Sequence, residues 1–179
     1  VTSGVYERAM NEIILPTVNG MKAEGHKFTG FLYAGLMIDK TGAPYTVEFN
    51  CRFGDPETQP IMSRLNSDLV DLLEAAIAGK LNSTIAEWNP QTAVGVVLAA
   101  ENYPDTPKKG DIITGLDEAD RIGKVFHAGT ALNENGKVVT NGGRVLCVVG
   151  LGDNVAAAKT KAYQAVQKIS FDGMQYRKD

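Results

Sequence analysis

Residues 45–52 read YTVEFNCR, a stretch in which apolar and polar side chains alternate. Because successive side chains of a β-strand point to opposite faces, this alternation predicts a strand with one apolar face and one polar face. We expect the apolar face to be buried, and it carries Tyr45, Val47, Phe49 and Cys51. The polar face carries Thr46, Glu48, Asn50 and Arg52.

The polar face suits a metal ion and an anion. Carboxylate and amide oxygens, such as those of Glu48 and Asn50, are ligands that Mg²⁺ accepts together with phosphate and water oxygens. Two residues of rise would separate them by roughly 7 Å along the strand. The Arg52 guanidinium suits a phosphate or carboxylate, which its planar fork binds through two hydrogen bonds. An ordinary solvent-facing strand shows the same pattern, so the strand alone leaves both interpretations open.

The following residues, 53–60, read FGDPETQP and form a predicted tight loop with two carboxylates and two prolines. Charged side chains gathered on a fixed loop are common at binding sites. Core packing does not require Glu, Asn, Arg, Asp and Glu within ten residues, which favours a functional site. Asp55 and Glu57 could each instead serve turn formation or helix capping before Pro60.

The stretch RFGDPETQ at residues 52–59 resembles the signature of the phosphoribosylamine–glycine ligase family, also called glycinamide ribonucleotide synthetases. Further stretches resemble the same family in the same order along the chain. They are GFLYAGL (30–36), VFHAGT (125–130), GGRVL (142–146) and Tyr176-Arg177. One loop departs from the family, because Glu101-Asn102-Tyr103-Pro104 stands where Gly-Tyr-Pro is expected.

The resemblance implies an ATP-grasp ligase of de novo purine synthesis. Such an enzyme joins glycine to 5-phosphoribosylamine through a glycyl phosphate, giving glycinamide ribonucleotide, ADP and phosphate. ATP is the co-substrate, and Mg²⁺ or Mn²⁺ is the implied metal. Family members are more than twice as long, so the resemblance implies a C-terminal portion, inactive alone, that needs the N-terminal part. The alternatives are another ATP-grasp carboxylate–amine ligase or carboxylase, or a non-catalytic fragment.

The resemblance also assigns roles to individual residues. Glu48 and Asn50 match positions that bind Mg²⁺ or Mn²⁺ at the ATP phosphates. Arg52 is the implied catalytic residue. The implied substrate-binding residues are Arg52, Asp55, Glu57 and Arg144.

The periodicity of the remaining chain indicates an α+β fold. Residues 1–84 are implied to form the C-terminal half of an ATP-grasp domain, an antiparallel sheet with helices. Residues 85–179 then form a small, β-rich C-terminal domain with one long helix. Expected helices are 4–15, 16–24, 68–79 and 154–169, with Ser3, Ser67-Asp68 and Asp153 as caps and Pro16 between the first two. Expected strands are 28–38, 45–52, 93–100, 125–132, 137–140 and 144–151.

Composition excludes several classes of protein. The chain of 179 residues is 44% hydrophobic and 22% charged, which is typical of a globular protein. A net charge of −3 argues against a general nucleic-acid binder. The two cysteines are far apart, which argues against a zinc cluster and predicts small buried side chains. No apolar run is long enough to span a membrane and no signal peptide is evident, so we expect a cytoplasmic protein.

Lysines outside the signature are predicted to be solvated. Lys108-Lys109-Gly110 reads as a turn at the surface. Lys159 and Lys161 read as residues on the exposed face of the last helix.

Overall fold

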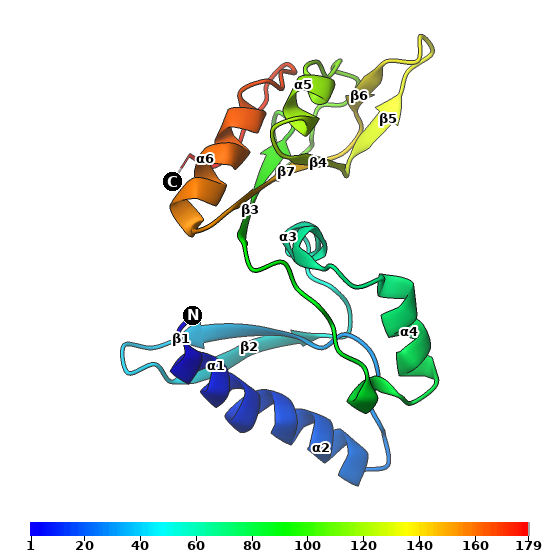
Figure 1. The fold of residues 1–179 in the computed structure, drawn as a ribbon. Coiled ribbons are helices and arrows are strands. Elements are labelled where there is room, and N and C mark those ends of the chain that lie inside the picture. Colours follow the sequence, from blue (N-terminus) through cyan, green and yellow to red (C-terminus); the bar gives the residue numbers. More distant parts are fainter. Residues whose placement is uncertain (179) are drawn as a thin grey trace. The chain divides into compact units, whose positions relative to one another are not determined.

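The computed structural model describes residues 1–178, and these form two compact units (Figure 1). The first unit comprises Val1–Gly54 and Asp68–Ile85. The second comprises Asp55–Ser67 and the chain from Ala86 onward. The polypeptide therefore enters the second unit at Asp55, returns to the first and leaves it again after Ile85. The division into domains at residues 84 and 85 stays a prediction.

A continuous helical stretch opens the first unit. α1 (Ser3–Ala9) leads into a π-helical turn, η1 (Met10–Ile14), and then into α2 (Leu15–Ala23). The prediction that Pro16 ends one helix or starts the next is confirmed in part, because Pro16 lies in the first turn of α2 but the helical backbone continues into it without a break. Proline lacks an N–H and its ring crowds the preceding turn of an α-helix, and the wider π-helical turn lies immediately before it.

The predicted β-hairpin follows. β1 (Tyr33–Ile38) pairs antiparallel with β2 (Pro44–Asn50). Asp39 holds the turn, because its carboxylate accepts hydrogen bonds from two backbone N–H groups of the turn. β1 is shorter than predicted, since residues 28–32 lie outside the strand.

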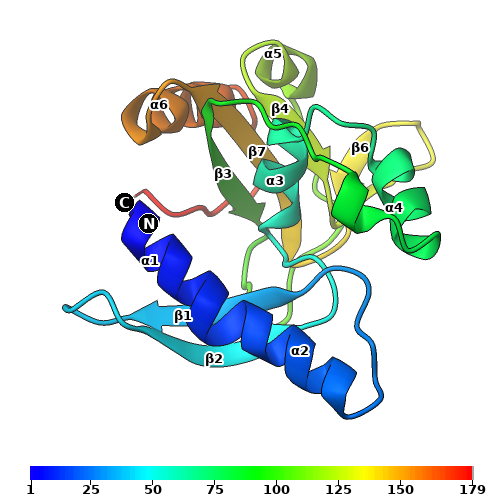
Figure 2. The ribbon, with the colours of Figure 1, turned by 60° about the horizontal axis from the view of Figure 1, so that its bottom comes forward.

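The apolar side chains of β2 are exposed, so the predicted buried face is wrong here. Tyr45 is 59% exposed, Val47 68% and Phe49 42%, and Cys51 is exposed as well. The hairpin has only two strands, and one helical stretch, α1 and α2, runs along it (Figure 2). A single helical layer cannot cover both faces of a sheet.

α4 (Leu69–Ile77) completes the first unit together with a short 3₁₀ turn, η2 (Leu81–Ser83). Gly79 follows the C-terminal capping residue Ala78 with φ +69°, a left-handed conformation that glycine adopts without strain. The apolar face predicted for this helix is only partly buried, because Ile77 is 88% exposed.

Among residues 1–178, three helix N-termini are capped by side chains. Asp68 caps α4 as predicted, with its carboxylate accepting from a backbone N–H at 2.7 Å. Thr2 rather than Ser3 caps α1, at 3.3 Å. Asn154 rather than Asp153 caps the last helix, at 3.0 Å. The two wrong cap predictions are each displaced by one residue, because neighbouring Ser, Thr, Asp and Asn side chains have similar capping preferences.

The second unit contains a three-stranded antiparallel sheet with the strand order β3-β7-β4. β7 (Arg144–Gly152) is the central strand, between β3 (Thr92–Ala99) and β4 (Lys124–His127). A separate hairpin is formed by β5 (Thr130–Leu132) and β6 (Val138–Thr140).

Residues 125–132, predicted as one strand, form two strands that part at Gly129. A Cβ on Gly129 would lie 2.6 Å from the Cα of Gly142, so the two backbones are in contact. The Gly129 N–H donates to the Arg144 carbonyl at 2.9 Å, and its carbonyl accepts from the Asn141 N–H at 2.7 Å. This backbone crossing ends β4 and starts the β5–β6 hairpin.

Helices cover both faces of the central strand. α6 (Val155–Val166) lies on one face, where a Cβ on Gly150 would be 2.4 Å from a backbone carbonyl oxygen of the helix. α3 (Thr58–Arg64) lies on the other, where a Cβ on Gly95 would be 3.0 Å from a proline ring of that helix. Residues 145–150 are all buried as a result. A strand buried on both faces reads as a continuous apolar run, which is why β7 was predictable.

Two α-helices of the described residues were not predicted. The first three residues of α3, 58–60, belong to the predicted tight loop, but Pro60 lies in the first turn of the helix, where a missing N–H costs no helical hydrogen bond. α5 (Leu116–Asp120) has five residues and is too short to show a helical period. No helix among residues 1–178 is long and apolar enough to cross a lipid bilayer.

The cysteines differ in their surroundings. Cys147 is 2% exposed, which confirms the prediction of a small buried side chain. Burial, and secondarily the nearby Asp55 charge, raise the pKa of its thiol to about 11. Cys51 lies at the surface, where the same prediction is wrong.

Candidate functional site

The hairpin places Glu48 and Asn50 on the same face of β2. Glu48 is paired with Gly35 and Asn50 with Tyr33, and residues two apart on one strand share a face. Gly35 leaves room for the acidic side chain, since a Cβ there would lie 3.0 Å from the Glu48 Cγ. The two predicted metal ligands therefore face the same side of the hairpin.

A β-bulge separates Thr46 from this face. Leu36 is paired with Thr46 rather than Val47, so β2 has one extra residue at this point. Because Leu36 follows Gly35 on β1, Thr46 lies on the face opposite to Glu48. The predicted polar face is wrong at this position, since regular alternation does not continue through a bulge.

The donor set fits a divalent cation whose coordination shell is completed by phosphate oxygens. Glu48 is exposed and Asn50 is half-buried, and they offer one carboxylate and one amide oxygen donor. Among residues 1–178, no three His, Cys, Asp or Glu side chains come together as a metal cage. Mg²⁺ keeps several waters and commonly takes only one or two protein ligands besides substrate phosphates.

Arg52 lies in the first unit, directly beyond β2, and is exposed. Its Nη1 donates a hydrogen bond to the Phe53 carbonyl at 2.9 Å. The Phe53 ring packs on Phe31, with 3.9 Å between the ring centroids, which anchors the backbone on this side. A guanidinium carries five N–H donors, so Arg52 can bind an anion while it keeps this bond.

Two of the predicted substrate-binding residues are in contact although 89 positions separate them. Arg144 Nη1 donates to the Asp55 carbonyl at 3.0 Å, and its Nη2 lies 3.6 Å from Asp55 Oδ2. The Arg144 side chain is 39% exposed and that of Asp55 is 64% exposed. An ion pair this exposed contributes little to stability. The contact matters more for the geometry of the site, because it holds the first residue of β7 against Asp55 of the signature (residues 52–59).

Glu57 occupies the N-cap position of α3, and its side chain makes no capping hydrogen bond there. The helix-capping interpretation of this carboxylate is therefore not supported. Glu57 is half-buried.

A pocket of about 880 Å³ lies beside Arg144 in the second unit. It follows the edge of β3 opposite to β7, where Ala99 pairs with Gln175, and its other walls come from α6, the segment around Gln175 and the loop around Tyr103. The side chains that carry polar groups there include Tyr103, Arg144, Lys159, Tyr163 and Gln175. Lys159, predicted to be solvated only, lines this pocket, with its Nζ 5.7 Å from the Tyr163 ring centroid.

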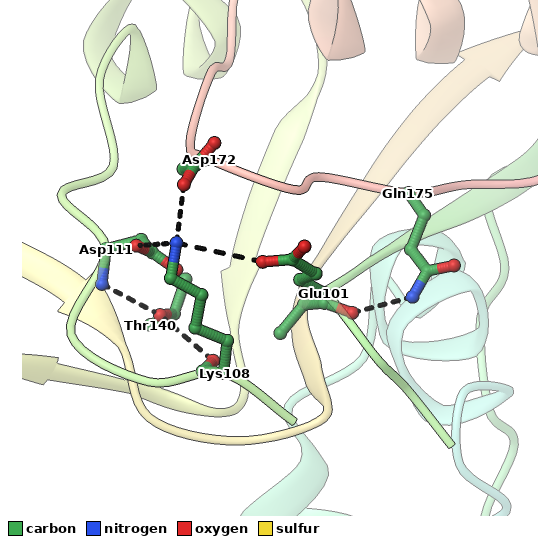
Figure 3. Close-up of polar contacts among 7 residues, drawn as sticks. Glu101, Lys108, Asp111, Thr140, Asp172 and Gln175 are labelled. Carbon is green, nitrogen blue, oxygen red and sulfur yellow. Dashed lines mark hydrogen bonds and ion pairs between the residues drawn. The ribbon is translucent and has the colours of Figure 1, made fainter. Parts of the chain in front are cut away.

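Lys108 is part of an ion cluster that the sequence did not predict (Figure 3). Its ammonium lies 2.5 Å from Asp172, 3.0 Å from Asp111 and 3.7 Å from Glu101. Hydrogen bonds to Asp172 and Asp111 hold its pKa above the ordinary range, despite partial desolvation. The solvated-turn interpretation is therefore wrong for Lys108. Glu101 and Asp111 are near Lys108 in the sequence, but Asp172 is 64 residues away, so no local pattern could have revealed the complete cluster.

Two family models match the chain. The phosphoribosylglycinamide synthetase ATP-grasp (A) domain matches residues 1–58, and the C domain of the same enzyme matches residues 93–179.

Curated relatives match along the whole chain. A phosphoribosylamine–glycine ligase of Neisseria meningitidis serogroup B is 83% identical over 179 residues. The ligase of Ralstonia nicotianae is 59% identical. The chain spans 42% of the length of each of these relatives.

Solved structures agree with these matches. A crystal structure of phosphoribosylamine–glycine ligase from Thermotoga maritima is 40% identical with a TM-score of 0.82, covering 100% of this chain and 44% of that one. The N5-carboxyaminoimidazole ribonucleotide synthetase of the same organism has a TM-score of 0.62 at 20% identity and shares the fold. The α+β fold predicted from the sequence is confirmed, and the chain belongs to the phosphoribosylglycinamide synthetase family.

Proposed function

We propose that the chain forms part of a phosphoribosylamine–glycine ligase that joins glycine to 5-phosphoribosylamine at the expense of ATP. The observation that carries this proposal is the 83% identity, over the full chain, to a protein of that name. Since the chain spans 42% of that relative, the other parts of the nucleotide site are assigned to the rest of a longer protein. As an enzyme of purine synthesis it would act in the cytoplasm.

The reaction has two steps. A carboxylate oxygen of glycine attacks the γ-phosphorus of ATP, and ADP leaves, which gives glycyl phosphate. The amine nitrogen of phosphoribosylamine then attacks the acyl carbon and loses a proton, and phosphate leaves as glycinamide ribonucleotide forms. Phosphoryl transfer of this kind depends on positioning and on neutralisation of charge rather than on covalent chemistry by the protein.

Glu48 and Asn50 are the residues that would hold the divalent cation. Their shared face, the space over Gly35 and the hard oxygen donors support this role. Mg²⁺ or Mn²⁺ bound there would offset negative charge on the ATP phosphates. Arg52, which follows the same strand, would orient an anionic oxygen of a reactant through its guanidinium.

Asp55, Glu57 and Arg144 are assigned to substrate binding. The bonds from Arg144 to Asp55 hold the guanidinium in the lining of the 880 Å³ pocket. A fixed guanidinium binds a phosphate group better than a mobile one, because less conformational entropy is lost on binding. The carboxylates could accept hydrogen bonds from the amine or the hydroxyl groups of the sugar.

The decisive experiment is a substrate screen of the longer protein that contains this chain. We expect ADP release that depends on both glycine and phosphoribosylamine, with glycinamide ribonucleotide as the product. ADP release with bicarbonate and a different ribonucleotide, and none with glycine, would instead identify a carboxylase.

The isolated chain provides a second test. We expect calorimetry of the 179 residues with ATP and Mg²⁺ to show no binding at micromolar concentrations, because the proposal assigns half of the nucleotide pocket to the remainder of the protein. Micromolar binding would contradict this division of the site.

A further inference from the structure

We propose that Tyr103 is a specificity-determining residue that contacts the sugar-phosphate substrate beside Arg144, and that Lys108 positions it. This inference rests on the function proposed above. It adds two residues to the substrate side that neither the signature nor its resemblance assigns.

Tyr103 and Arg144 line the same pocket. The contact between them runs through Gly143, because a Cβ on Gly143 would lie 2.4 Å from the Tyr103 Cδ2. The phenol ring therefore lies directly on the backbone that precedes Arg144. It is 37% exposed, so part of the ring faces the open pocket.

The chemistry of the two side chains suits a phosphorylated pentose. Arginine binds phosphate through paired hydrogen bonds. A tyrosine ring offers an apolar face for the C–H groups of a sugar and a hydroxyl that can hydrogen-bond to its oxygens. The volume of about 880 Å³ lies within the range of small-molecule sites and is ample for a pentose phosphate.

The segment 100–108, here called the Tyr103 loop, is held at both ends. Gln175 Nε2 donates to the carbonyl oxygens of Ala100 at 2.7 Å and Tyr103 at 3.3 Å. The Lys108 N–H donates to the Glu101 carbonyl at 3.0 Å. The loop is therefore closed on itself and tied to the C-terminal segment that carries Gln175.

The Lys108 cluster fixes the far end of the same loop (Figure 3). The ammonium joins Glu101 of the loop to Asp111 and Asp172. Gly173 packs against Glu101, since a Cβ on Gly173 would lie 2.4 Å from the Glu101 Cβ. Removal of the ammonium would leave three carboxylates close together, and their repulsion would release the loop.

The experiment is a titration of the isolated chain with ribose 5-phosphate, without ATP, followed by the backbone amide signals in NMR spectra. We expect the signals of Tyr103, Gly143 and Arg144 to shift. Tyr103→Ala should weaken binding about tenfold, the value of one aromatic contact. Gly143→Ala should weaken binding as well, because its new methyl group displaces the ring.

Lys108→Met should cause a smaller loss of affinity, and Lys108→Arg should restore it. Lys109→Met is the matched control, because it removes a neighbouring positive charge outside the cluster. Fluorescence of Trp88, the single tryptophan, shows whether each variant is folded. Unchanged affinity in folded Tyr103→Ala, or shifts confined to residues outside the pocket, would overturn the proposal. Inorganic phosphate that binds as tightly as ribose 5-phosphate would do the same, since the sugar would then make no contact.

Kinetics of the longer ligase separate this inference from the proposed function. We expect Tyr103→Ala to raise the KM for phosphoribosylamine and to leave the KM for ATP unchanged. Ligation with an unchanged KM for phosphoribosylamine would contradict the role of Tyr103 alone. Absence of glycine ligation in the wild type, with Tyr103-dependent binding of ribose 5-phosphate, would contradict the proposed function alone.

Discussion

Replacement of Gly150 by alanine tests the packing of α6 on the central strand. The new Cβ would lie 2.4 Å from the Ala158 carbonyl oxygen and 2.5 Å from the Ala162 backbone nitrogen. Ordinary contacts begin near 3.4 Å, so the helix would have to move about 1 Å away from β7. Both neighbours are backbone atoms of a helix, so neither can rotate out of the way as a side chain would.

The cost of this movement follows from the residues that it separates. Ala158, Ala162, Ala165 and Val166 of α6 are each fully buried. A gap of about 1 Å would forfeit up to half of their dispersion contacts with the sheet. Overpacking of a core typically costs about 1–3 kcal/mol, and we expect about 3 kcal/mol here, at the upper end. For a unit of this size the melting temperature would fall by roughly 10–20 °C.

Thermal unfolding followed by Trp88 fluorescence measures this loss, because Trp88 lies in the second unit. Gly136→Ala is the comparison variant. Gly136 has φ +70°, and a methyl group added there would meet no heavy atom within 4 Å, so this variant carries backbone strain alone, about 1 kcal/mol. A Gly150→Ala protein as stable as the Gly136→Ala variant would refute the close contact between α6 and β7.

Three further predictions concern the titrating and capping groups. Lys108 lowers the pKa of Asp172 by hydrogen bonding and charge, so Asp172 stabilises the fold above the pKa of an unfolded aspartate. This stability should be lost as the pH falls below about 4 and passes through the lower pKa of Asp172 in the folded state. In unfolding measured as a function of pH, Lys108→Met should remove this loss of stability in acid. Cys51 should react quickly with a thiol reagent at pH 8 while Cys147, with a pKa of about 11, reacts only after unfolding, so two fast thiols in the native protein would contradict the burial. Asn154→Ala should destabilise the second unit by about 1 kcal/mol in urea unfolding, and an unchanged midpoint would show that the cap is dispensable.

The elements that were predicted correctly are those whose own sequence carries the signal. The hairpin of β1 and β2 follows from an apolar run and an alternating stretch on either side of a turn that Asp39 closes. β7 is a continuous apolar run because helices cover both of its faces. The errors arise where a distant segment decides the local structure. The break at Gly129 depends on its crossing with Gly142, which no local pattern contains.

Among the candidate site residues, too, local sequence predicts some placements and only the fold reveals others. Alternation along β2 placed Glu48 and Asn50 together, but the bulge that moves Thr46 to the other face is a property of the pairing with β1. The contact of Arg144 with Asp55 joins residues far apart in sequence, and only the fold reveals it. The prediction for Lys108 failed for the same reason, since Asp172, one of its three acidic partners, lies 64 residues away.

The most direct test of the proposed site is the turnover of Glu48→Gln in the longer ligase at ordinary Mg²⁺ concentration. Glutamine keeps the shape of the side chain and removes the charge that would hold the cation. We expect ADP release and product formation to fall about 100-fold or more, and to recover in part at raised Mg²⁺ or Mn²⁺. Thr46→Val, on the opposite face of β2, should retain wild-type turnover. Wild-type turnover of Glu48→Gln at ordinary Mg²⁺ would contradict the assignment of this strand to the metal site.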